Sequence, residues 1–228
     1  MIAERWRAVR ANVDEACARA GRDPATVTIV AVSKHHPASA VREALAAGAT
    51  DFGENYAQEL AGKQAELDLQ VRWHFIGRLQ SNKAKLVAGK VALVHAVEGL
   101  GLAQELGKRA AAVQPILLAV NLGGEATKGG VTGEGALAIA KALVATANIR
   151  LDGLMTMPPP AEDPEASRPI FEELRALRDR LRDALGVPLP VLSMGMSGDY
   201  EVAIACGSTH VRIGTAIFGE RPALSSAG

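Results

Sequence analysis

The stretch that decides the fold is Val27-Thr28-Ile29-Val30-Ala31-Val32, which runs directly into Ser33-Lys34. The first six residues carry no charge, and five of them are β-branched. A parallel strand that is buried on both faces reads as such a continuous apolar run. Pro37 is then placed to open a helix and Gly48 to end it. The segment therefore predicts one strand–helix unit of a parallel α/β fold.

The same unit recurs along the chain, because short apolar runs alternate with helical patterns. The predicted strands are 27–32, 51–55, 72–77, 91–97, 115–122, 151–157, 191–196 and 210–213. The predicted helices are a lead-in helix over 1–20, a helix that follows the second strand and ends at about residue 67, and segments around 37–48, 83–86, 102–112, 136–147, 171–185 and 200–206. Eight such units in one chain predict a (β/α)8 TIM-type barrel, with a doubly wound open sheet as the alternative. No linker interrupts the pattern, so we expect a single domain over 1–228 with a loose tail from about residue 220.

The composition is that of an ordinary globular protein. Hydrophobic residues make up 48% of the 228 residues, and 25 basic side chains balance 25 acidic ones. This neutral balance argues against a nucleic-acid or anionic membrane partner. The two cysteines form neither a disulfide framework nor a metal-binding pattern, and no apolar run approaches the roughly 20 residues that span a bilayer. We therefore expect a cytoplasmic protein, and a monomer because nothing marks a further interface.

The chemistry of a barrel lies at the carboxyl ends of its strands. The first strand ends at Lys34. Partial desolvation there would lower the pKa of the lysine and supply the neutral amine that a Schiff base requires. The alternative interpretation, an ordinary surface lysine, stays open on position alone.

The last two strands end in small polar residues that suit a phosphate group. Ser197-Gly198 and Gly214-Thr215 offer hydroxyls and bare backbone N–H groups at a place where barrels often bind phosphate. A Schiff-base lysine facing a phosphate site describes the two ends of pyridoxal 5'-phosphate (PLP). Arg212 lies two residues before Gly214 and would donate to the ring nitrogen of that cofactor. Such a donor disfavours ring protonation, so carbanion chemistry should be limited.

Several motifs together resemble a known family. They are Ala31-Val32-Ser33-Lys34 with Pro37, Phe52-Gly53-Glu54-Asn55-Tyr56, His74-Phe75-Ile76-Gly77, Asn121 with Glu125 and Lys128, Gly153-Leu154-Met155, Ser193-Met194-Gly195-Met196-Ser197 and Val211-Arg212-Ile213-Gly214-Thr215. The chain resembles the YggS/PROSC family of pyridoxal phosphate homeostasis proteins from about residue 5 to 219. The resemblance implies the barrel of alanine racemase without that enzyme's second domain. It also implies a PLP binder that buffers or delivers the cofactor and has no established catalytic activity.

The resemblance carries roles onto particular residues. Lys34 matches the Schiff-base lysine, Arg212 the ring-nitrogen partner, and Ser197, Gly214 and Thr215 the phosphate contacts. Further residues match positions near the ring, namely Asn55, His74 and Met194. The chain departs from the family pattern at His35-His36, where a threonine is more usual after the lysine. A metal site there is not expected, because adjacent residues of an extended chain point to opposite sides.

Three functions fit these observations to different degrees. The first is a non-catalytic PLP carrier that serves apo-PLP enzymes, with no catalytic residues. The second is a PLP-dependent amino-acid racemase, which needs a second base opposite the lysine. The third is a Schiff-base aldolase of phosphosugars, which needs no PLP. His95 and His210 lie in apolar strands and are interpreted as satisfied core residues.

Overall fold

Eight parallel strands close into one barrel in the computed structural model, which describes residues 1–67, 71–123 and 129–220. Each strand pairs with its neighbours in sequence order, and β8 returns to pair with β1. The strands are β1 Thr28–Val32, β2 Asp51–Glu54, β3 Arg72–Phe75, β4 Leu93–Val97, β5 Gln114–Ala119, β6 Ile149–Met155, β7 Val191–Met196 and β8 His210–Ile213. The predicted (β/α)8 barrel is confirmed, and the open-sheet alternative is excluded by closure.

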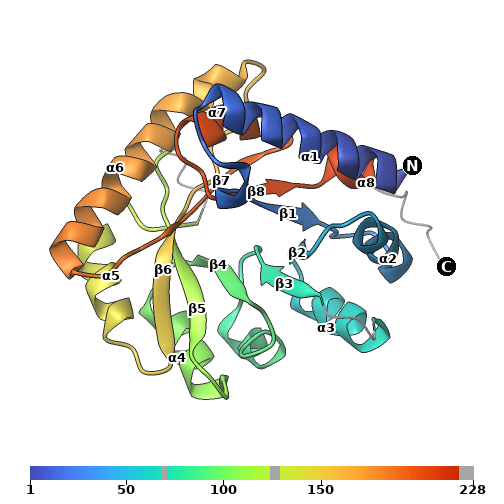
Figure 1. The fold of residues 1–228 in the computed structure, drawn as a ribbon. Helices are drawn as coiled ribbons and strands as arrows, with labels where there is room; N and C mark the ends of the chain where they lie inside the picture. Colours follow the sequence, from blue (N-terminus) through green and yellow to red (C-terminus); the bar gives the residue numbers. More distant parts are fainter. Residues whose placement is uncertain (68–70, 124–128, 221–228) are drawn as a thin grey trace.

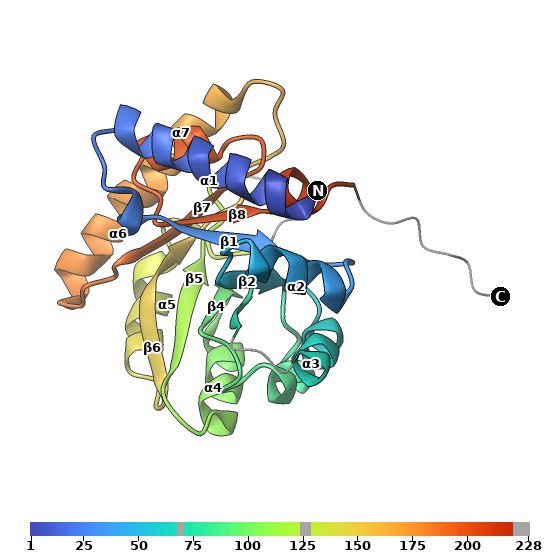
Figure 2. The same cartoon turned by 45° about the vertical axis from the view of Figure 1, so that its right-hand side comes forward.

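Helices surround the barrel (Figure 1). They are α1 Ile2–Arg19, α2 Ala38–Ala46, α3 Ala57–Glu66, α4 Leu100–Arg109, α5 Ala136–Val144, α6 Arg168–Leu185, α7 Tyr200–Ala205 and α8 Thr215–Phe218, with the 3-10 helices η1 Pro24–Thr26, η2 Ser81–Leu86 and η3 Pro164–Ser167. Because α8 is only four residues long, it leaves a gap in the outer ring beside β8. The lead-in helix α1 fills it by packing against α2, α7 and α8 (Figure 2).

The helix expected around 83–86 differs from the prediction. It is the six-residue 3-10 helix η2, and Gly89 follows at a φ of 71°. Six residues make only about two turns of 3-10 helix, and this geometry is common in short connectors. The expected tail lies almost wholly outside the described residues, as does most of the 123–130 loop.

The apolar core is divided by the barrel wall. Side chains such as Phe52, Leu154 and Val211 face the helices, whereas Leu117 and Met155 fill the barrel interior. This alternation along each strand decides which polar residues face inward. Among the described residues, no helix combines the length and apolarity that crossing a bilayer requires.

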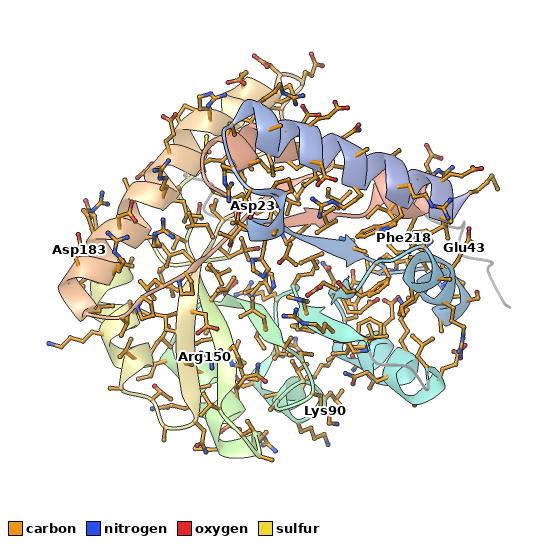
Figure 3. All side chains as sticks on the ribbon, viewed as in Figure 1. Asp23, Glu43, Lys90, Arg150, Asp183 and Phe218 are labelled. Atoms are coloured by element: carbon orange, nitrogen blue, oxygen red, sulfur yellow. The ribbon has the colours of Figure 1, made fainter. Side chains whose placement is uncertain are left out.

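The helix ring is also tied together by polar contacts. Glu43 of α2 lies at the start of α1 (Figure 3). Its carboxylate accepts hydrogen bonds from the backbone N–H groups of Ile2 and Ala3 at 2.9 and 3.3 Å. A neighbouring helix thus caps α1, which has no side-chain cap of its own.

Candidate functional site

One pocket at the carboxyl ends of the strands collects most of the predicted site residues. It is a cavity of about 310 Å³, within the size range of small-ligand sites. Six of the eight predicted residues line it, namely Lys34, Asn55, Ser197, Arg212, Gly214 and Thr215. They follow or end β1, β2, β7 and β8, which closure of the barrel brings together.

The backbone around Lys34 is held by a buried ion cluster behind β1. Lys63 of α3 donates from Nζ to the backbone oxygen of Ser33 at 2.7 Å, to Glu54 Oε1 at 2.6 Å and to Glu59 Oε1 at 2.9 Å. The backbone N–H that follows Lys34 donates to the same Glu59 oxygen at 2.6 Å. Burial raises the pKa of Glu54, although its contacts with Lys63 and Ser33 oppose the rise. The cluster anchors the chain on both sides of Lys34.

Arg212 brings a buried guanidinium to the wall of the pocket. Its Nη1 donates to Ser193 Oγ at 2.6 Å, and its Nη2 donates to the backbone oxygen of Thr156 at 3.0 Å. Burial lowers the pKa of Arg212 to about 10. A guanidinium has only donors, so it suits a ligand atom that accepts, such as a neutral ring nitrogen.

The turn after β7 supplies the polar face expected for phosphate. Asp199 organises this turn, since its Oδ1 accepts from the backbone N–H of Met196 at 2.7 Å and its Oδ2 accepts from Ser167 Oγ at 3.0 Å. A Cβ added at Gly198 would meet no atom within 4 Å, so the backbone there faces open space. Ser197 and Gly198 both line the pocket. An anion can therefore come close to the backbone of this turn.

Two predicted residues do not line the pocket. Met194 packs in the core between the barrel and the helices, and Met196 lines the pocket instead. The pairing of β7 with β8 shifts register between Ser193 and Met196, around Gly195 at a φ of 93°. The resulting bulge turns Met196 inward. His74 does face inward, but it lies deeper in the barrel, where it contacts Asp51 and His95 rather than the pocket.

The pocket also contains residues that sequence reasoning did not assign to it. His36 lines it, and its ring lies 5.2 Å from that of Phe218. Burial lowers the pKa of His36, and the charge of Lys63 adds to the effect. Among the described lining residues there is no carboxylate and no tyrosine. Within the same described chain, no three acidic, histidine or cysteine side chains are grouped to hold a metal ion.

A larger cavity of about 810 Å³ adjoins the pocket and shares Asn55 with it. Its polar lining includes Lys83 and the pair formed by Arg78 Nε and Glu98 Oε2 at 3.2 Å. Arg78 is mostly exposed, and the cavity lacks both strand-end phosphate turns. The smaller pocket therefore carries the more specific chemistry.

Comparison with known proteins gives a consistent result over nearly the whole chain. Residues 5–222 match the family described as alanine racemase, N-terminal domain. A pyridoxal phosphate homeostasis protein of Pseudomonas aeruginosa is 51% identical over 224 residues, which cover 96% of each chain. The structure of PipY from Synechococcus elongatus PCC7942 with PLP bound has a TM-score of 0.85 and 34% identity, covering 96% of this chain and 100% of that one.

Alanine racemase itself is a more distant likeness. The enzyme of Corynebacterium glutamicum gives a TM-score of 0.69 at 21% identity, covering 96% of this chain and 62% of that one. At this level of identity, the likeness concerns the fold alone.

Proposed function

Since this chain belongs to the family of pyridoxal phosphate homeostasis proteins, we propose that its strand-end pocket binds PLP and that the protein holds the cofactor for delivery rather than for turnover. The observation that carries the proposal is the convergence of an amine, a guanidinium and two small polar turns in one cavity. When bound, PLP supplies an aldehyde that bonds to an amine and a ring that withdraws electrons.

Each end of the cofactor has a matching group in this chain. Lys34 would provide the amine for covalent attachment. Ser197 and Thr215 would donate hydroxyl hydrogens to the phosphate, with Gly214 leaving room for a backbone N–H contact. Arg212 would donate to the ring nitrogen. Asn55 adds a buried Oδ1 without a partner in the described chain, which suits a donor on the ligand.

The charges around the pocket favour holding over catalysis. A PLP enzyme that stabilises a carbanion commonly pairs the ring nitrogen with a carboxylate, whereas an arginine keeps that nitrogen unprotonated. The described pocket lining offers Arg212 and no carboxylate. It also offers no tyrosine opposite Lys34 to act as a second base. Delivery to apo-PLP enzymes is the use of bound PLP that these features favour.

The binding test is covalent trapping. Purified protein is incubated with PLP, reduced with borohydride and digested, and mass spectrometry locates the pyridoxyl group. We expect it on Lys34, and none after Lys34→Ala. Lys90→Ala is the matched control, because that exposed lysine lies at the periphery (Figure 3) and precedes β4, at the amino ends of the strands and not at the carboxyl ends where the pocket lies. A pyridoxyl group distributed over surface lysines, unchanged in the Lys34 variant, would refute the binding site.

The carrier role is tested separately. Loaded protein should restore the activity of an apo-PLP enzyme while leaving the chirality of L-amino acids unchanged. Sustained racemisation by the wild type that is lost in Lys34→Ala would show an enzyme instead.

A further inference from the structure

A line of buried polar side chains leads from Arg212 through the barrel to its opposite end. Ser193 Oγ lies 2.8 Å from His95 Nδ1, His95 Nε2 lies 2.9 Å from His74 Nδ1, and His74 Nε2 lies 2.8 Å from Asp51 Oδ1. None of these side chains is more than 6% exposed. Asp51 begins β2, so the line ends at the barrel mouth opposite the pocket.

The groups at the two ends of this line fix the direction in which its hydrogen bonds are donated. Arg212 can only donate, so Ser193 Oγ accepts from Nη1 at 2.6 Å. At the other end burial raises the pKa of Asp51, but hydrogen bonds with His74 and Thr50 outweigh it and the net pKa is lowered. Asp51 is therefore an ionised acceptor, and His74 Nε2 carries the hydrogen.

The donor and acceptor roles of the two histidines and of Ser193 follow from His74 donating to Asp51. A histidine ring with a single hydrogen that donates from Nε2 accepts at Nδ1, so in this arrangement His95 donates to His74 from Nε2. His95 then accepts at Nδ1 from the Ser193 hydroxyl. A neutral His95 fits its surroundings, because burial lowers its pKa well below the usual value and the Arg212 guanidinium adds to the effect. Every hydrogen in the line has an acceptor.

We infer that Ser193, His95, His74 and Asp51 are positioning residues that hold the Arg212 guanidinium through one directed hydrogen-bond chain. The inference rests on the proposed function only for the identity of the ligand that Arg212 meets.

The hydrogen-bond chain also helps to compensate the buried charge of Arg212. Its two hydrogen-bond acceptors in the described structure, Ser193 Oγ and the Thr156 carbonyl, are both neutral. Burial of a guanidinium is costly unless nearby charges offset it, and Asp199 supplies one such charge. Hydrogen bonds in series polarise one another, so the negative charge of Asp51 strengthens the acceptor that Arg212 meets. The neighbouring ring of His210, 5.9 Å from His74 and 6.0 Å from His95, packs beside the chain.

The direction is tested on protein without PLP. Nuclear magnetic resonance of protein labelled with ¹⁵N-histidine reports which ring nitrogen carries hydrogen. We expect the Nε2–H tautomer at both His74 and His95. An Nδ1–H tautomer or a doubly protonated ring at either histidine near neutral pH would overturn the inference.

The positioning role is tested by PLP titration. Breaking the chain with Ser193→Ala or His95→Phe should weaken PLP binding about tenfold or more, the range for a lost hydrogen bond to a charged group. It should also shift the absorption band of bound PLP, which reports on its ring nitrogen. His95→Gln keeps a donor and an acceptor and should retain more affinity than His95→Phe. His210→Phe, which alters packing in the same layer and leaves the chain intact, is the matched control and should change affinity less than about twofold.

The outcomes separate the two proposals. If Ser193→Ala and His95→Phe bind PLP as the wild type does, with an unshifted band, the positioning role is refuted and the proposed function stands. If the wild type itself does not bind PLP, the proposed function fails, while the tautomers still decide whether the chain exists.

Discussion

Replacing Lys63 by methionine should destabilise the fold by about 3–5 kcal/mol at neutral pH. Lys63 is 6% exposed and Glu54 0% exposed, and their charged atoms lie 2.6 Å apart. Methionine keeps the volume of the side chain but leaves Glu54 buried without a cation. Breaking a buried ion pair from one side costs about this much.

Protonation of Glu54 limits the penalty and gives it a pH signature. A carboxyl group with an unfolded-state pKa of about 4.3 takes up a proton at a cost of about 4 kcal/mol at pH 7 and about 1 kcal/mol at pH 5. Because the pKa of Glu54 in the folded variant is raised, stability is lost as the pH rises through the interval above the unfolded pKa. The difference between variant and wild type should therefore shrink from pH 7 to pH 5.

Urea unfolding of both proteins at the two pH values measures this difference. Lys108→Met is the matched control, because the pair between Lys108 and Glu105 is 70% and 28% exposed and should contribute about 1 kcal/mol or less. The double change Lys63→Met with Glu54→Gln should recover much of the loss, since it removes both charges. A deficit below about 1 kcal/mol at pH 7, or the same deficit at both pH values, would refute the reasoning.

Three other perturbations have defined outcomes. Arg212→Met should weaken PLP binding about ten- to a hundredfold without lowering stability to a similar extent, since it removes a buried charge together with its donors; parallel PLP titration and urea unfolding check this. Gly77→Ala should cost about 1–3 kcal/mol in unfolding free energy, because the new Cβ would lie 2.2 Å from a backbone oxygen, whereas Gly62→Ala in α3 has open space and should stabilise by up to about 1 kcal/mol. Burial lowers the pKa of His210 to about 3 and that of His95 well below its usual value, so the unfolded chain binds protons that the folded form does not. Stability should fall as the pH drops below about 6.5, by up to about 1.4 kcal/mol per pH unit for each ring, and His210→Phe should reduce that slope in denaturant titrations. A slope unaffected by His210→Phe would contradict this assignment.

Much of the barrel was readable from the sequence because buried parallel strands have a local signature. The run from Val27 to Val32 and its seven counterparts predict the strands without knowledge of their partners, and strand ends then predict where the chemistry gathers. Lys34 and Arg212 could be assigned because each depends on its own strand's position and alternation. The helical segment around 83–86 was predicted but its 3-10 geometry was not, since a short connector carries too few residues to express a period.

Only the tertiary structure decided which inward residues meet. The family resemblance predicted Met194 near the ring, but the bulge at Gly195 brings Met196 to the pocket, and such a departure from regular strand pairing has no local signature. His95 and Ser193, 98 residues apart, become hydrogen-bonded because the barrel closes and its interior is narrow enough for strands on different sides to touch. The sequence was therefore sufficient to identify Lys34 and Arg212 as candidate site residues. The hydrogen-bond chain behind Arg212 exists only because closure of the barrel brings the inward-facing residues of distant strands together at one axis.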